Sequence, residues 1–403
     1  MDTDVLIVGG GLNGPLAALA LARVGLRCVV LDARPRATFD EDGFDGRSYA
    51  VALGSIRMLR ALSLWDHLKD GAQPIRGIRA SDGRAGEGAS PLHLAFDAEE
   101  IGEPFMGQMI EDRHLRPVLL AACDAAPNIT LRYDCTVTAQ DTTPGHVTVT
   151  LAGGETITAS LLLGCDGRAS GVATRAGIGR VGTDYAQTAL VCAVEHARDH
   201  GGIAHQFFMP AGPLAILPLR GNRSSIVWTE TADTATELNA LSDAGYLEVL
   251  RPRFGSFLGA LTLTGARHTY PLVLSLAQAF VAPRVALVGD AAHGIHPIAG
   301  QGLNLGFKDI AALADVVSDA RKRGEDIGAS DVLARYQRWR RFDTTAMGLA
   351  TDAVNRLFSN DNPLLRLGRD LGMGAISAMP PARRAFIREA AGLTGDLPAL
   401  MRP

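Results

Sequence analysis

The segment that most constrains this chain is a glycine-rich turn close to its start. Residues 5–8 form a short apolar run, which is typical of a buried parallel strand. Residues 9–14, with the sequence GGGLNG, follow this run, and residues 15–24 are rich in the helix-forming residues Ala and Leu. A second apolar run over residues 27–31 ends at Asp32. The pattern predicts a βαβ unit with a G-x-G-x-x-G turn and an acidic residue at the end of its second strand.

Each glycine of the G-x-G-x-x-G pattern has a structural reason to be glycine. Gly9 permits a tight turn, Gly11 lets backbone N–H groups approach a pyrophosphate, and Gly14 lets helix and strand pack closely. Asp32 can accept hydrogen bonds from an adenosine ribose. The sequence therefore predicts a dinucleotide-binding site; the alternative is a tight glycine turn in an ordinary α/β sheet.

The charge and composition of the 403-residue chain exclude several classes of protein. The formal net charge is −4 and aromatic residues make up only 5%, which argues against a nucleic-acid partner. The five cysteines form no CxxC pair, so we expect neither a disulfide framework nor a zinc site, and we expect a reducing, cytoplasmic environment. Residues 5–22 carry no charge, but glycines interrupt them and acidic residues precede them, unlike a signal peptide.

The rest of the chain predicts a discontinuous nucleotide-binding domain. Short β-like runs between turn residues over 189–229 suggest an antiparallel sheet, and residues 234–250 suggest one helix. Residues 285–288 return to the pattern of an apolar strand that ends in glycine, and the pattern is helical from Asp331 on. We therefore expect an α/β fold with a Rossmann-like domain, an inserted, mostly antiparallel β substrate domain and a helical C-terminal segment.

The domain boundaries that we predict are as follows. The Rossmann-like domain covers residues 1–75, 100–182 and 280–340, the substrate domain covers 76–99 and 183–279, and the C-terminal segment covers 341–403.

Two further motifs follow apolar strands. Residues 161–167 read LLLGCDG, and residues 285–309 read VALVGDAAHGIHPIAGQGLNLGFKD. With the N-terminal glycine motif, they resemble the three signatures of the class A flavoprotein monooxygenases, the aromatic hydroxylases typified by 4-hydroxybenzoate hydroxylase. The form HPIAGQGLNLG at residues 296–306 and the segment FSNDNP at residues 358–363 are similar to the subfamily of ubiquinone-biosynthesis hydroxylases. The resemblance implies that the Rossmann-like domain binds FAD.

The residues that could hold FAD fall on these motifs. The Asp290 carboxylate is placed to bind a ribityl or ribose hydroxyl, and the Asn304 amide could reach an amide edge of the flavin. The resemblance gives Asp166 a role near the pyrophosphate and places Arg47 and Arg113 near FAD. The full set of expected cofactor-binding residues is Gly9, Gly11, Gly14, Asp32, Arg47, Arg113, Asp166, Asp290, Pro297, Gly300, Gly302, Leu303 and Asn304.

Several of these residues also have simpler interpretations. Asp166 could belong to an ordinary Asp-Gly turn, Asp290 could cap a turn, and the two arginines could form surface salt bridges. A helix that starts near Gly302 would direct its positive end at the flavin edge where negative charge builds on reduction.

The substrate pocket and the catalytic groups are less specified by the sequence. The resemblance places Leu217, Pro218 and Trp228 at the pocket wall, although Trp228 could simply belong to the sheet core. His293 and His296 invite a metal hypothesis, but no cluster of ligands completes a site, so we expect no metal. His296 and Pro297 are flavin-adjacent candidates, and we name no general base.

The resemblance implies a reaction in which NAD(P)H reduces FAD and O2 then forms a C4a-hydroperoxyflavin that hydroxylates an aromatic ring. The expected substrate is a polyprenylated ubiquinone precursor. Two alternatives stay open: a soluble phenolic or polyketide substrate, and a non-catalytic FAD-binding subunit of a biosynthetic complex. The C-terminal stretch mixes arginines with large apolar residues, so contact with the inner face of a membrane or with a ubiquinone-biosynthesis complex is an open expectation, as is a homo-oligomer.

Overall fold

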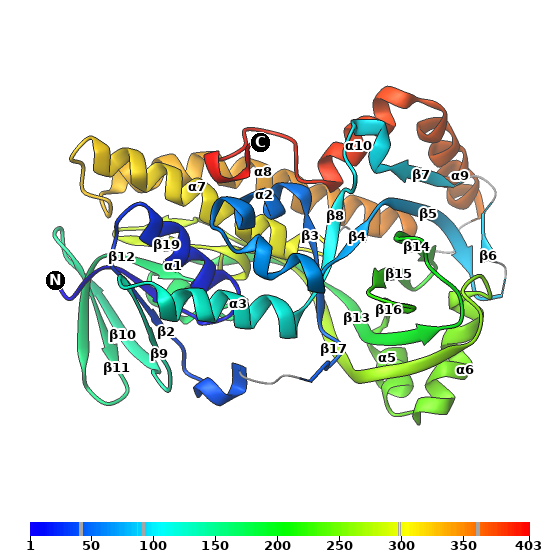
Figure 1. Cartoon of the computed structure of the whole chain (residues 1–403), viewed down its shortest axis with the longest axis horizontal. Helices are drawn as coiled ribbons and strands as arrows, with labels where there is room; N and C mark the ends of the chain where they lie inside the picture. Colours follow the sequence, from blue (N-terminus) through cyan, green and yellow to red (C-terminus); the bar gives the residue numbers. More distant parts are fainter. Residues whose placement is uncertain (40–42, 87, 91–92, 297, 299, 360–362) are drawn as a thin grey trace.

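The computed structural model describes the whole chain except residues 40–42, 87, 91–92, 297, 299 and 360–362 (Figure 1). For residues 88–89, 363–367 and 370 it describes the backbone alone. The described residues build three sheets, with helices packed over two of them and a run of long helices at the C-terminal end of the chain.

The first sheet contains the predicted βαβ unit. Strands β9, β2, β1 and β12 are parallel neighbours in this order, and β19 is parallel to the second half of β12. Most side chains of β1, β2, β19 and the second half of β12 are buried, as expected for parallel strands covered on both faces, whereas β9 at the edge is more exposed. The strands of this sheet are β1 (Thr3–Val8), β2 (Cys28–Leu31), β9 (Ile129–Arg132), β10 (Val137–Thr142), β11 (Val147–Leu151), β12 (Thr156–Gly164), β18 (Val281–Ala282) and β19 (Val285–Leu287).

The second sheet is mostly antiparallel and holds the expected inserted strands. Its order is β20-β17-β13-β16-β15-β14-β5-β6, with β7 paired to β5, and β14 and β5 form a parallel pair. The strands are β5 (Gly77–Arg84), β6 (Gly88–Ala89), β7 (Leu94–Asp97), β13 (Arg180–His196), β14 (Ile203–Met209), β15 (Gly212–Leu219), β16 (Arg223–Thr231), β17 (Leu261–Ala277) and β20 (His293–Gly294).

The two faces of the second sheet have different neighbours. The outer face carries an apolar core with α5 (Ala232–Asn239) and α6 (Asp243–Phe254). The inner face, which includes Ala193 and Leu217, packs with the small third sheet of β3 (Ser48–Ala52), β8 (Gly107–Glu111) and β4 (Gln73–Ile75). The single helix predicted over residues 234–250 is wrong, because Ser242 begins a second helix by accepting a hydrogen bond from Gly245 N.

The helices α1, α3 and α7 lie over the first sheet, and α8 reaches from there to the second sheet. α1 packs against α3 and α7, and α8 runs from α7 to the inner side of the second sheet (Figure 1). The remaining helices are α1 (Asn13–Arg23), α2 (Leu53–Ala61), α3 (Asp112–Ala125), α4 (Gly171–Arg175), α7 (Gly302–Lys322), α8 (Ser330–Phe358), α9 (Pro363–Ala378) and α10 (Pro380–Ala390). Among the described residues, no helix is long and apolar enough to cross a bilayer.

The C-terminal segment contacts both large sheets or the helices that cover them. Arg369 of α9 forms a buried ion pair with Asp82 of β5, with 2.7 Å between Nη2 and Oδ2. The chain then returns to the first sheet, where the short turn η7 (Ala399–Met401) packs on α2 and α7 and Met401 is buried. The C-terminal segment therefore bridges the two large sheets.

Candidate active site

The turn between β1 and α1 has the geometry of a dinucleotide-binding turn. Gly9 has φ +110°, and a Cβ on it would lie 2.3 Å from the Cys165 carbonyl oxygen. A Cβ on Gly14 would lie 1.9 Å from the Gly9 oxygen. No described heavy atom lies within 4 Å of the place where a Cβ on Gly11 would stand. Two glycines therefore make close packing possible, and the third borders open space at the start of α1.

The Asp32 carboxylate lies at the end of β2, directly beside this turn. It accepts hydrogen bonds from Gly10 N (2.7 Å) and from Arg34 N (2.8 Å), and Arg34 also forms an ion pair with it. Burial raises the pKa of Asp32, but these hydrogen bonds and the Arg34 charge outweigh it, so the pKa is lowered overall. The carboxylate is thus ionised and fixed as an acceptor.

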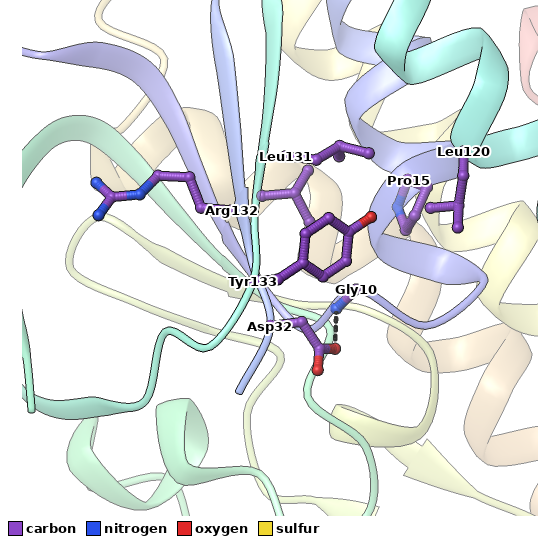
Figure 2. A pocket seen from close by; sticks show the side chains of 8 residues that line it. Gly10, Pro15, Asp32, Leu120, Leu131, Arg132 and Tyr133 are labelled. Atoms are coloured by element: carbon purple, nitrogen blue, oxygen red, sulfur yellow. Dashed lines mark hydrogen bonds between the residues drawn. The ribbon is translucent and has the colours of Figure 1, made fainter. Parts of the chain in front are cut away.

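A small pocket opens next to Asp32 between α1, α3 and the ends of β2 and β9. Figure 2 shows Pro15, Leu120 and Leu131 on one side of it and the Tyr133 ring and the Asp32 carboxylate on the other. Apolar surface beside a fixed carboxylate suits a nucleoside, because the base needs apolar contact and the ribose hydroxyls need acceptors.

Asp166 and Asp290 follow the ends of two neighbouring strands, β12 and β19. Asp166 accepts hydrogen bonds from Ser170 Oγ (2.5 Å) and Val172 N (3.0 Å), so its carboxylate caps α4. The Asp290 side chain is 42% exposed and pairs with Arg168 at 3.3 Å. Asp166 therefore shapes the turn that packs on Gly9, whereas Asp290 keeps carboxylate surface free for a hydroxyl ligand.

Asn304 joins the start of α7 to the third sheet. Its Oδ1 accepts from Ala52 N and Ser55 Oγ, both at 2.8 Å, and its Nδ2 donates to Ala50 O and Gly300 O. These bonds use both donors and both acceptor directions of the amide. The side chain therefore has no free group for the expected contact with a flavin amide edge, and it positions the start of α7 instead. The first N–H groups of α7, from Gly302 and Leu303 on, remain at the helix end that faces the glycine-rich segment.

A buried ionic network lies under the Gly289–Ala291 turn, and sequence reasoning missed it. Asp309 of α7 accepts from His293 Nε2 (2.6 Å), Arg340 Nε (2.8 Å) and Gly289 N (3.1 Å). The side chains of Asp309, His293 and Arg340 are 0% exposed. His293 and Arg340 lower the pKa of Asp309 against the opposing effect of burial. The i, i+3 spacing of the two histidines was a visible signal, but the partner of His293 proves to be a helix carboxylate.

Arg47 and Arg113 are both held by local carboxylates. Arg47 pairs with Asp45 (2.5 Å), and Arg113 pairs with the buried Glu111 (2.7 Å). The Arg113 guanidinium also lies over the Phe44 ring at 5.4 Å. These contacts fit the salt-bridge interpretation of both arginines, and their role near FAD remains a prediction.

The residues expected at the pocket wall lie on opposite faces of the second sheet. Leu217 faces the inner side of the second sheet, with Ala193 and Ala204. Trp228 packs in the outer core, where its ring lies 5.7 Å from Tyr246 of α6, so it does not line a pocket on the inner face. Pro218 lies two positions after the outward-facing Ile216 on the same strand. Its side chain therefore also points away from the inner face.

His296 lies between the Asp290 turn and α7, and Pro297 lies outside the described residues. His296 is 0% exposed, and its ring contacts the Tyr185 ring edge-on at 5.3 Å between centroids. Burial lowers its pKa to about 4, so the imidazole is neutral at physiological pH. Among the described residues, no group of three or more His, Cys, Asp or Glu side chains could hold a metal ion.

These features fit an FAD molecule. The open space at Gly11, the apolar side chains beside Asp32 and the accessible carboxylate of Asp290 lie at the carboxyl ends of neighbouring strands in one sheet. The protein family described as "FAD binding domain" matches residues 2–346. The chain belongs to this family.

Relatives that match nearly the full chain indicate which subfamily the chain belongs to. The chain is 45% identical to ubiquinone hydroxylase UbiL of Rhodospirillum rubrum, over 99% of this chain and 92% of that protein. It is 36% identical to 3-demethoxyubiquinol 3-hydroxylase of Escherichia coli, over 97% and 99%. This chain is thus a class A FAD monooxygenase of the ubiquinone-hydroxylase subfamily, with NAD(P)H and O2 as co-substrates.

Solved structures confirm the fold. The p-nitrophenol 4-monooxygenase PnpA of Pseudomonas putida superposes with a TM-score of 0.81 at 21% identity, covering 98% of each chain. PqsL of Pseudomonas aeruginosa superposes with a TM-score of 0.76 at 23% identity, covering 92% of this chain and 99% of that one. The predicted α/β architecture, with its Rossmann-like domain, β insertion and helical C-terminal segment, is confirmed.

Proposed function

We propose that this monooxygenase hydroxylates the aromatic ring of a polyprenylated ubiquinone precursor. The observation that carries the proposal is the identity with two ubiquinone-pathway hydroxylases over nearly the whole length of all three chains. That length includes both large sheets and the C-terminal helices, so the region over the inner face of the second sheet is shared as well as the FAD-binding turn.

FAD, when bound, supplies the activation of O2, and the chain supplies binding and orientation. We assign the pyrophosphate to the backbone at Gly11, the adenosine ribose to Asp32 and the ribityl chain to Asp290. The N-terminal N–H groups of α7 would stabilise negative charge at the flavin edge. Asn304 fixes that helix end against β3, so these N–H groups keep their place without a contact from the amide itself.

The first test is the quinone content of lipid extracts from a strain that lacks this gene. We expect a prenylated ring one oxygen short to accumulate, and the same extract to recover when the gene is restored. A normal ubiquinone pool, together with hydroxylation of soluble phenols by the purified enzyme, would replace this substrate by the small-phenol alternative. FAD-loaded protein that oxidises no NAD(P)H with either substrate class would favour the non-catalytic subunit.

We also propose that the enzyme works at the inner face of a membrane. Along the outward side of α8, Phe342 and Leu349 are 77% and 57% exposed, and Arg338 of the same stripe is exposed. Apolar side chains beside cations suit an anionic lipid surface. Binding to vesicles with acidic phospholipid should fall with added salt and with Phe342→Ser. Equal binding of wild type and Phe342→Ser to these vesicles, or no binding by either protein, would contradict the proposal.

A further inference from the structure

His296 is a buried histidine whose two ring nitrogens lack a partner within the described part of the chain. Among the described residues, neither Nδ1 nor Nε2 finds a hydrogen-bond partner, although His296 is 0% exposed. The buried His196 differs, because its Nδ1 contacts Arg198 O at 2.7 Å and its Nε2 contacts Ser224 Oγ at 3.0 Å. His293, three residues before His296, has the Asp309 carboxylate.

An imidazole in this condition is costly to the folded state. A neutral histidine always carries one N–H donor and one acceptor nitrogen, and burying either without a partner destabilises the folded state. Its ring makes only a van der Waals contact with Tyr185, which an apolar side chain could make without that cost. The unpaired nitrogens therefore call for a ligand that the chain itself does not provide.

The surroundings of His296 place that ligand beside the flavin and under the second sheet. The residue lies between Asp290 and the N-terminus of α7, the two elements assigned to the flavin. Its neighbour Ile295 packs with Leu274 of β17, and α8 passes close by, since a Cβ on Gly348 would lie 3.7 Å from Ile295 Cγ2. The imidazole is thus enclosed by the second sheet, α8 and the flavin-binding segment.

We propose that His296 binds the hydroxyl group of the aromatic substrate, with one ring nitrogen accepting the phenolic O–H hydrogen bond and Tyr185 holding the ring in place. This inference rests on the proposed aromatic hydroxylation. The neutral imidazole accepts the hydrogen bond without taking the proton, so the group acts as a specificity-determining ligand. Fixing one ring hydroxyl fixes which ring carbon faces the flavin.

The first test changes the substrate and leaves the enzyme intact. A short-tail prenylated phenol and its methyl ether are titrated into the FAD-loaded wild-type enzyme, and the dissociation constants are read from flavin absorbance. We expect the phenol to bind at least tenfold more tightly, because the ether has no proton to donate. Equal affinity for both compounds would overturn the proposal.

The second test changes the residue. In His296→Gln, FAD content should match the wild type, while KM for the phenol rises at least tenfold and more NAD(P)H ends as hydrogen peroxide per turnover. The preference for the phenol over the ether should shrink. His205→Gln is the matched control: that histidine packs on Phe257 at the outer face of the same sheet, and its variant should behave as the wild type.

The outcomes separate this inference from the proposed function. If wild-type enzyme hydroxylates the phenol but the variant keeps its KM and its coupling, the function stands and the role of His296 falls. If His296→Gln loses FAD, the residue is structural, and the substrate comparison in wild type then decides alone. If the wild type hydroxylates no phenol, the proposed function itself fails.

Discussion

At the scale of single residues, the glycines of the first turn show why a short motif can be predictive. Gly9 and Gly14 are required because other backbone atoms lie where their Cβ atoms would stand. This close approach is a local property of the turn, so the spacing of the glycines in the sequence predicts it. We expect a different reason for Gly11, since the space beside it holds no described atom and is where we place the cofactor.

That difference makes Gly11 a sharp probe of the cofactor site. Gly11→Ala should leave the stability of the FAD-free protein unchanged, because its Cβ meets no described atom within 4 Å. It should weaken FAD binding at least tenfold, because the methyl group occupies the space of the pyrophosphate. Flavin fluorescence titration measures the affinity. Gly145→Ala, equally open but remote in the β10–β11 turn, is the control, and unchanged affinity in Gly11→Ala would contradict the site.

His296 should also contribute to the pH dependence of stability. Its folded-state pKa is lowered to about 4 from 6.5, so the unfolded chain takes up the proton first as pH falls. Stability should therefore decline between about pH 6.5 and 4, by at most about 3 kcal/mol from this group. Urea unfolding at several pH values should show a shallower decline in His296→Gln, whereas replacement of the exposed His67 should leave the slope unchanged. An unaltered slope in His296→Gln would refute the prediction.

The residues that sequence reasoning misassigned fail for a common physical reason. Pro218 and Trp228 lie on strands, and only strand parity decides which face a side chain takes. The alternation of side chains along a strand divides its positions into two sets. It does not show which set packs against α6 on the outer face and which set lies on the inner face. The partners of Asp309 were invisible for another reason, since Arg340 lies 31 positions away in the chain.

At the scale of elements, α7 and α8 are joined by charge as well as by apolar packing. Asp309 of α7 and Arg340 of α8 meet with His293 beneath the turn that carries Asp290. The sequence predicted the strand, the turn and the first helix of this region, because glycine and the apolar pattern mark them. The ion pair between the two helices could not be predicted, because it depends on how the helices cross.

Removal of Arg340 should therefore weaken the protein strongly. In Arg340→Met the buried Asp309 carboxylate loses a charged partner, and breaking such a pair costs about 3–5 kcal/mol. Chemical unfolding of the FAD-loaded enzyme measures the loss. Arg338→Met on the exposed side of the same helix should cost less than about 0.5 kcal/mol. Similar losses in both variants would show that the buried network contributes nothing specific.

The ion pair between α9 and the second sheet makes a similar prediction. In Arg369→Met, Asp82 of β5 loses the Arg369 guanidinium, so α9 should separate from the sheet more often. Limited proteolysis should then cut within residues 359–380 faster than in wild type, while Arg384→Met at an exposed position of α10 should not change the rate. Equal cleavage of wild type and Arg369→Met would contradict this role.

At the scale of the whole molecule, the discontinuous order of the chain was predictable and the sheet pairing was not. Residues 285–288 repeat the pattern of the first strand, and β19 does join β12 in the first sheet. The parallel pairing of β5 with β14 carries no local signal, because it joins segments more than one hundred residues apart. The exact domain boundaries remain a prediction.

FAD should stabilise the whole protein because its expected site is built from distant parts of the chain. A ligand present at one hundred times its dissociation constant adds about 2.7 kcal/mol to the free energy of unfolding. Calorimetry of the FAD-free protein should therefore show a lower Tm that rises with added FAD, with riboflavin giving a smaller rise because it lacks the adenosine part. A Tm independent of FAD would contradict a site shared by Asp32, Asp290 and α7.

The return of the chain to the first sheet has a practical consequence for tagging. Met401 is buried against α2 and α7, and Ala399 N donates to the Asp315 carboxylate at 2.7 Å. An affinity tag or fluorescent protein joined directly after Pro403 would follow the buried Met401 closely, beside the helix whose N–H groups we assign to the flavin. A label at Met1, whose side chain is 69% exposed, would avoid that helix. Reporter fusions of this enzyme are therefore best built from the front of the chain.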